Sequence, residues 1–173
     1  MDYERALKLV VDSFGDGKIA RHCIATSKKA VEIAEKIKAN GHEVDLELVK
    51  VGALLHDIGR ARTHDIEHNY EGSVMLRELG FEELARAVER HGANIFEVMH
   101  PKEMTLEEKI IYIADKLTEE DEYVNLDERF RKVVERRKKH GKIDEIRQIE
   151  KAIKITKEIE EEINKLAEGA NKQ

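Results

Sequence analysis

Residues 46–59 read LELVKVGALLHDIG, a stretch that is apolar on nearly every side of a helix. Such a pattern predicts a buried helix over residues 46–57 at the centre of the fold. Asp45 is suited to cap its beginning, and Gly59 ends it. His56 and Asp57 stand at the end of this apolar helix, where polar side chains are costly to bury unless they find partners.

The rest of the chain follows the same helical period, and alternating strand patterns are nearly absent. The sequence therefore predicts an all-α fold. Thr105 and Glu108 form a capping box before one helix, and Gly41 is the expected left-handed stop of another. Residues 60–67 read as a polar loop, and residues 93–104, which hold the single Pro, read as irregular. The expected helices cover residues 2–13, 18–40, 46–57, 69–79, 82–90, 105–116, 126–139 and 142–168.

Composition narrows the class of protein. The chain has 173 residues, enough for one domain with a sizeable core, and a formal net charge of −6. Cys23 is the single cysteine, so no internal disulfide is expected, and its apolar surroundings place it in the core. There is no apolar run of about 18 residues, and the N-terminus does not resemble a signal peptide. We expect a cytoplasmic protein with no membrane partner.

The most basic stretch runs from Arg129 to Lys139 and also carries Glu135, which favours a solvated helix face over a nucleic-acid surface. We therefore expect no duplex nucleic acid as a partner. After Thr118 the helices become highly charged, so we divide the chain into residues 1–118 and an extension of residues 119–173. The last helix has a narrow apolar seam of Ile146, Ile149, Ile153 and Ile163. It is expected to pack on the core or on a partner chain, with a homodimer as one outcome.

Four residues carry the chemistry. His22 lies near the start of the second helix, off the centre of its apolar stripe, and Asp115 ends the apolar segment IIYIADK. An aspartate is a poor residue for a helix core, and a pair with Lys116 is the structural explanation for it. Together with His56 and Asp57, these residues could make one mixed nitrogen and oxygen site. Such ligands suit Fe, Mn, Co, Ni or Zn rather than Ca.

The order His22, His56-Asp57, Asp115 resembles the H…HD…D pattern of the HD superfamily of phosphohydrolases. The resemblance covers roughly residues 18–116, and HDIG followed by IADK makes it fairly specific. It implies a helical bundle with a metal centre between helices and the hydrolysis of phosphoester bonds by a metal-activated water. It also implies that one or two divalent ions are bound.

His68 and His91 lie between the HD pair and the last aspartate. This arrangement resembles the members with two metals, where Asp57 bridges the ions and these two histidines complete the second site. The alternatives are that His68 begins or caps a helix and that His91 is favoured by a helix dipole. His64 competes with His68 for the role.

A phosphate substrate also requires cations. Arg60 and Arg62 directly follow the HD motif, while Arg90 and Lys116 adjoin expected ligands. An arginine can hold a phosphate with two parallel hydrogen bonds, although such arginines can equally pair with nearby carboxylates on the surface. We expect Asp57, Arg60 and Lys116 to take part in catalysis, with His64 or Lys116 as the general acid.

The segments HDIGR, HNYEGS and IIYIADK narrow the resemblance further. They are similar to an archaeal branch with an iron-dependent phosphodiesterase of dihydroneopterin 2′,3′-cyclic phosphate. They also resemble bacterial enzymes that cleave dinucleoside tetraphosphates. Both imply a small, nucleotide-like phosphate substrate. Two alternatives stay open: a non-catalytic module that binds nucleotides or a protein partner, and a di-iron oxygenase.

Overall fold

The fold is all-α, as predicted. The structure is a computed structural model that describes residues 1–65, 67–139 and 143–169. The α-helices of these residues are α1 (Tyr3–Phe14), α2 (Lys18–Ala39), α3 (Leu46–Leu55), α4 (His68–Glu78), α5 (Glu82–Glu89), α6 (Leu106–Lys116), α7 (Leu126–Lys139) and α8 (Ile143–Glu168). The shorter elements are the 3₁₀ helices η1 (Ile58–Ala61), η2 (Ala93–Glu97) and η3 (Pro101–Glu103), and the strands β1 (Thr118–Glu119) and β2 (Glu122–Tyr123).

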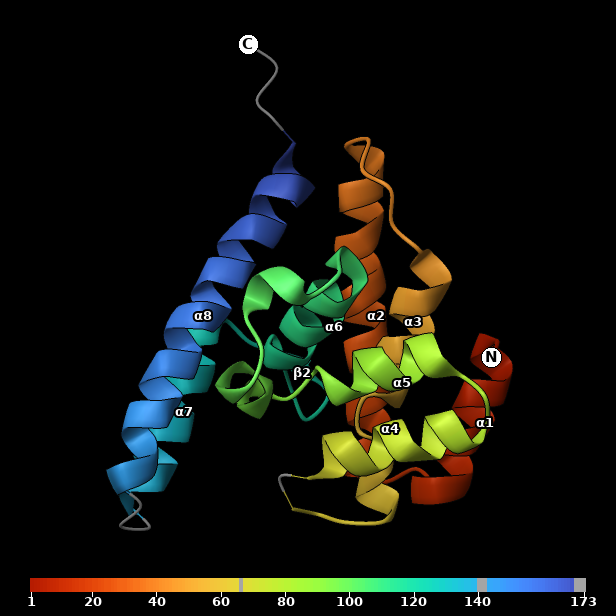
Figure 1. The fold of residues 1–173 in the computed structure, drawn as a ribbon, viewed down its shortest axis with the longest axis horizontal. Coiled ribbons are helices and arrows are strands. Elements are labelled where there is room, and N and C mark those ends of the chain that lie inside the picture. Colours follow the sequence, from red (N-terminus) through yellow and green to blue (C-terminus); the bar gives the residue numbers. More distant parts are fainter. Residues whose placement is uncertain (66, 140–142, 170–173) are drawn as a thin grey trace.

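Helix α3 is largely buried, in agreement with its apolar sequence. It packs against α1, α2, α5 and α6 (Figure 1). Leu54 and Leu55 belong to a cluster with α1, α4 and α5, whereas Val49 and Ala53 belong to a second cluster with α6 and α8. Because both clusters include α3, this helix joins the two halves of the core. Cys23 of α2 is fully buried in the first cluster, as expected.

Local signals in the sequence set the helix ends. Asp45 Oδ1 accepts a hydrogen bond from Leu48 N at 2.9 Å, so it caps α3. Thr105 and Glu108 form the predicted capping box at the start of α6. Gly41 follows α2 with φ 89°, the left-handed conformation that glycine adopts without a steric penalty.

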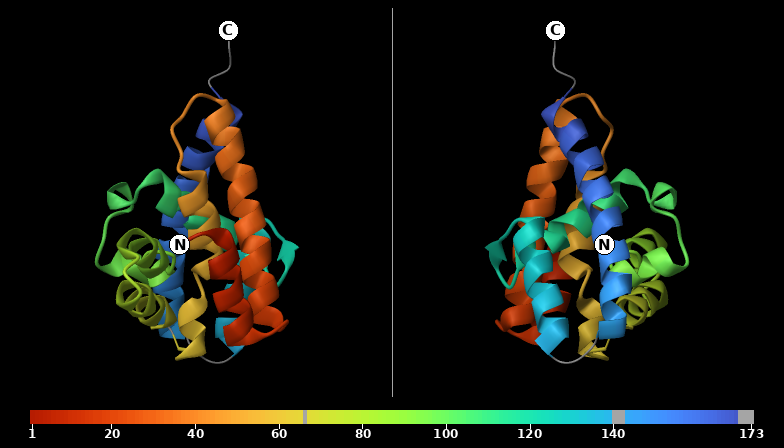
Figure 2. Two further views of the ribbon diagram at one scale, coloured as in Figure 1. Left: turned by 90° about the vertical axis from the view of Figure 1, so that its right-hand side faces the viewer. Right: turned by 90° about the vertical axis from the view of Figure 1, so that its left-hand side faces the viewer.

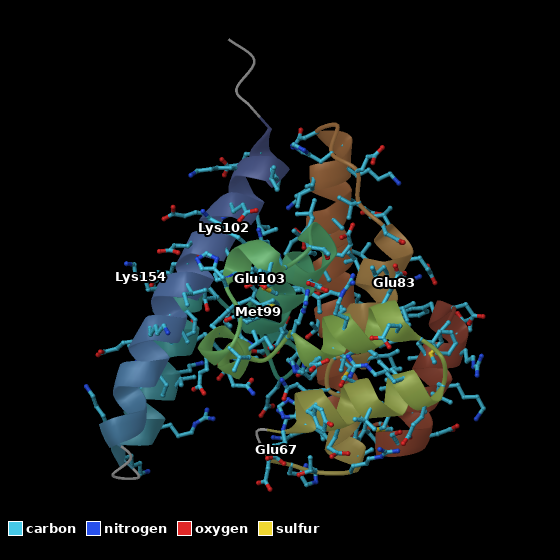
Figure 3. The ribbon with its side chains drawn as sticks, in the orientation of Figure 1. Glu67, Glu83, Met99, Lys102, Glu103 and Lys154 are labelled. Atoms are coloured by element: carbon cyan, nitrogen blue, oxygen red, sulfur yellow. The ribbon has the colours of Figure 1, made fainter. Side chains whose placement is uncertain are left out.

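Several boundaries differ from the prediction. Helix α3 ends at Leu55 rather than at residue 57, and the chain then tightens into η1, whose last two residues fall in the predicted polar loop. The irregular segment contains η2 and η3, and its residues Met99, Lys102 and Glu103 lie on the side of the molecule that faces the viewer in Figure 3. A two-stranded hairpin, β1–β2, follows α6, with Glu119 opposite Glu122. These elements span two to five residues each, too short for a periodic pattern to predict.

The C-terminal helices α7 and α8 lie side by side against one flank of the molecule (Figure 2). Helix α8 packs on α2 and α6 of its own chain, where Tyr112 Oη and Thr156 Oγ1 are 2.7 Å apart. Ile159 and Ile163 are buried there, whereas Ile149 and Ile153 are half-buried. Of the predicted seam, the Ile146 side chain lies outside the described residues. The homodimer stays a prediction.

Across the described ranges, no helix combines the length and the apolar character that crossing a bilayer requires.

Candidate metal centre

The structure brings together all six residues predicted as metal ligands. They come from different elements: His22 from α2, His56 and Asp57 from the end of α3, His68 from the first turn of α4, His91 from the residues after α5, and Asp115 from the last turn of α6. Five of them line one cavity of about 270 Å³. His56 is fully buried and in contact with His22. The ends of five helices therefore converge on one point.

Three of these side chains form a first donor set. His22 Nε2 lies 3.1 Å from Asp115 Oδ1 and 3.2 Å from His56 Nε2. His56 Nε2 is in turn 3.6 Å from Asp115 Oδ1. The three atoms are close enough to be ligands of a single ion. Two imidazole nitrogens and a carboxylate oxygen are a donor set for a divalent transition metal.

A second donor set lies beside the first. His68 Nε2 is 3.1 Å from Asp57 Oδ1 and 3.3 Å from His91 Nε2. His91 Nε2 is 3.6 Å from the same Asp57 oxygen. The other oxygen of Asp57, Oδ2, lies 3.8 Å from His56 Nε2 and so faces the first set. Asp57 is thus the carboxylate that both sets share.

All four imidazoles are oriented by the main chain. Each places its Nδ1 within hydrogen-bond distance of a carbonyl oxygen: His22 with Glu120 (2.8 Å), His56 with Ala53 (2.7 Å), His68 with Asp65 (2.8 Å) and His91 with Val88 (2.5 Å). A carbonyl can only accept, so each Nδ1 carries a proton and donates it. In the neutral ring, Nε2 then holds a lone pair that points toward the centre, the arrangement typical of metal-bound histidines.

This arrangement fits a cation. Two neutral Nε2 lone pairs 3.2 Å apart, as in His22 and His56, repel each other unless a proton or a metal ion lies between them. The same holds for His68 and His91, whose Nε2 atoms are 3.3 Å apart. Each pair also has a carboxylate oxygen beside it. We conclude that the donor chemistry of both sets suits a bound divalent ion.

The pKa shifts of the residues in the first donor set also fit a bound cation. Burial lowers the pKa of His22, but the hydrogen bond to Asp115 and the charges of Asp115 and Asp57 outweigh it, so the pKa of His22 is raised above its ordinary value. Burial lowers the pKa of His56 to about 4. Burial would raise the pKa of Asp115, yet Lys116 and His22 hold that pKa well below its usual range. The His22 imidazole is therefore more basic than an ordinary histidine, because it lies beside the Asp115 carboxylate.

A pH dependence of metal binding follows from these pKa shifts. An ion must displace the proton of His22, so its affinity for the first set should fall as the pH decreases below the raised pKa of His22, by up to about tenfold per pH unit. His56 and Asp115 add little between about pH 5 and 8, because His56 is neutral and Asp115 ionised throughout that range. Calorimetric titration with Mn(II) across this range measures the slope. His22→Asn should bind more weakly and with a shallower dependence, and an equal slope in both proteins would contradict the prediction.

The structure also locates the predicted cations. Arg60 Nε donates to Asp57 Oδ2 at 2.7 Å, and Lys116 Nζ contacts Asp115 and the His91 carbonyl, so both line the cavity. Arg62 instead pairs with Glu78 and Glu71, and Arg90 pairs with Glu108. Both arginines thus follow the alternative in which they pair with nearby carboxylates rather than with a phosphate. His64 is exposed and is not among the residues that line the cavity.

Sequence reasoning missed two contributors. The carbonyl of Glu120, in the β1–β2 hairpin, orients His22, and Glu120 adopts a left-handed φ of 55°. Arg129 of α7 lines the metal cavity, although its segment was interpreted as a solvated helix face. Neither carries a sequence signal, because any residue can supply a carbonyl and because Arg129 lies among similar basic residues.

The fold is all-helical, and two histidine–carboxylate donor sets lie where the helix ends converge. These two features are those of a helical metal-binding protein. The HD domain family model matches residues 19–120, so the chain belongs to the HD domain family. An uncharacterised protein of Methanocaldococcus jannaschii is 44% identical over 147 residues, which cover 79% of this chain and 86% of that protein. No solved structure gives a significant match.

Longer relatives carry names connected with RNA. The tRNA (cytidine(56)-2′-O)-methyltransferase of Picrophilus torridus is 35% identical over 136 residues, which cover 72% of this chain but 38% of the methyltransferase. The ribonuclease Y of Acidothermus cellulolyticus is 35% identical over 82 residues, 46% of this chain and 16% of that protein. The chain thus matches less than half the length of either relative.

Proposed function

We propose that the chain is a metal-dependent phosphohydrolase that acts on a small, nucleotide-like phosphoester, with 2′,3′-cyclic phosphates as the leading candidates. The observation that carries the proposal is the pair of donor sets that share Asp57 and open into a cavity lined by Arg60 and Lys116. Membership of the HD domain family supports hydrolysis, and the RNA-related names of two relatives support a ribonucleotide.

In this proposal His22, His56 and Asp115 would hold one ion, His68 and His91 would hold a second, and Asp57 would contribute to both sites. Divalent ions in such sites lower the pKa of a bound water toward about 7 and offset the negative charge of a phosphate. The nitrogen and oxygen donors favour Fe, Mn, Co, Ni or Zn as the metal.

The cations of the cavity bind and orient the substrate. Arg60 uses its Nε–H for Asp57, and its Nη groups are the proposed donors to a phosphate oxygen. Lys116 is the proposed proton donor to the leaving group, since it lines the cavity whereas the competing candidate His64 does not. No covalent intermediate would be required, because a water activated by the bound ions would be the nucleophile.

The test is the metal dependence of hydrolysis. Protein purified without chelator is analysed for metal, stripped, and reloaded with Fe(II), Mn(II), Co(II), Ni(II) or Zn(II). It is then assayed on nucleoside 2′,3′-cyclic phosphates, nucleoside monophosphates and bis-p-nitrophenyl phosphate. We expect up to two ions per chain and hydrolysis that requires them. Metal-dependent nucleotide binding without turnover would favour the non-catalytic module, and oxygen consumption by the iron form would favour an oxygenase.

A further inference from the structure

Arg129 places the C-terminal extension in contact with the metal cavity. Asn125 Oδ1 accepts from Glu128 N at 2.8 Å, which fixes the first turn of α7, and Leu126 is buried beneath that turn. From this turn Arg129 Nη1 donates to the carbonyl of Thr118 at 2.7 Å. The half-buried guanidinium lines the cavity together with Arg60 and Lys116. It comes from beyond residue 120, where the family match ends.

Arg129 also lines a second and larger space. A groove of about 740 Å³ lies between the β1–β2 hairpin and α7, and Arg129 is the residue that it shares with the metal cavity. The metal cavity, at about 270 Å³, is slightly below the range of roughly 300–1,000 Å³ typical of ligand pockets. The metal cavity alone is therefore small for a whole nucleotide. The groove beyond Arg129 offers the adjoining space.

The charge of the groove differs from that of the metal cavity. Its lining contains five carboxylates against three cations. The carboxylates are Glu119, Glu120, Asp121, Glu122 and Glu128, and the cations are Arg129, Lys132 and Arg136. Lys132 is already paired with Glu119 at 2.6 Å and with Glu128 at 3.1 Å. Glu120 and Asp121 pair in turn with Lys18 at 2.9 Å and with Arg21 at 3.4 Å, two cations outside this lining. The groove thus holds its charges in ion pairs and offers no excess positive charge to a further phosphate, while its acceptor oxygens suit hydroxyl and amino groups.

We propose that Arg129 binds the phosphate of the substrate at the metal cavity and that the groove receives the uncharged sugar and base. This inference rests on the proposed function and narrows its substrate class. The substrate is a nucleoside with a single phosphate, either a cyclic diester or a monoester, and a polyphosphate is disfavoured. The extension formed by α7 is then part of the substrate site.

Arg129→Gln is the first test, with Arg131→Gln as its matched control. Arg131 lies two residues along the same helix, is exposed, and pairs with Glu135 at 3.2 Å. For the Mn(II)-loaded protein we expect Arg129→Gln to weaken the binding of a nucleoside 3′-monophosphate by about 10- to 100-fold and to raise the KM for the 2′,3′-cyclic substrate similarly. Arg131→Gln should match the unchanged protein. Arg129→Lys keeps the charge without the planar fork, so its affinity should lie between the two.

The second test compares substrates. A nucleoside 2′,3′-cyclic phosphate should be hydrolysed with a kcat/KM at least about tenfold above that of a dinucleoside tetraphosphate, because the groove offers no excess positive charge to the additional phosphates. Equal binding by Arg129→Gln and Arg131→Gln, or equal efficiency on both substrates, would overturn the inference. If the protein hydrolyses none of these substrates yet binds the monophosphate through Arg129, the proposed function fails and the binding site stands. Thermal melting and metal content check that each variant is folded and loaded.

Discussion

Replacing Asp57 by asparagine is expected to reduce the metal-dependent hydrolysis by about a thousandfold or more. Asp57 is the single carboxylate shared by both donor sets, with Oδ1 3.1 Å from His68 Nε2 and Oδ2 2.7 Å from Arg60 Nε. Asparagine has a similar volume but no charge, and its amide –NH₂ cannot accept from Arg60 or bind a cation. The variant should therefore lose bound metal as well as activity, which assays and elemental analysis would measure together.

A matched control separates this effect from a general loss of charge. Asp12 is an exposed aspartate on α1 that pairs with Lys8 and does not line the metal cavity, so Asp12→Asn should leave activity and metal content unchanged. Circular dichroism should show the helical signal retained in both variants. An Asp57→Asn protein that keeps both its metal and its rate would exclude Asp57 from the site and remove the basis for the proposed hydrolysis.

The helices could be predicted from the sequence because their signals are local. Helix α3 is apolar on nearly every side, and Asp45, Thr105 and Glu108 mark helix starts by hydrogen bonds that span three residues. The end of α3 was harder to predict, since Leu54, Leu55 and Ile58 keep a helical spacing past residue 55 and hide the change to η1. Periodicity shows that a helix exists, but it does not fix its last turn.

The meeting of the six candidate ligands depends on contacts between distant parts of the chain. His22 and Asp115 are 93 positions apart, and no local pattern shows that they touch. The resemblance to the HD superfamily supplied that expectation, and the structure places the side chains within hydrogen-bond distance. Arg129 had no such guide. Arg129 and Arg131 occupy the same charged helix, and only the packing of α7 against the hairpin decides that Arg129 faces the cavity.

Gly59→Ala is expected to destabilise the protein by about 3 kcal/mol or more, which would lower the melting temperature by roughly 6–12 °C. A Cβ at Gly59 would lie 1.9 Å from the His68 carbonyl oxygen and 2.4 Å from the Gly72 nitrogen. Both are main-chain atoms of α4, so no side-chain rotation relieves the clash. The substitution would therefore force helix α4 to move away from η1. The HDIG motif has glycine at this position because the main chains of η1 and α4 touch there.

The matched control is Gly41→Ala, where a Cβ meets no atom within 4 Å but the backbone has φ 89°. That variant pays only the left-handed strain, about 1–2 kcal/mol, so a loss at Gly59 no larger than this would contradict the steric argument. The His68 carbonyl is the nearest atom to the added methyl group, so a folded Gly59→Ala protein must have displaced His68 from Asp57. Its metal content should then fall toward one ion per chain, because the set of His22, His56 and Asp115 does not involve α4. Loss of both ions would instead mean that the two sets form only together, with Asp57 as the residue that couples them.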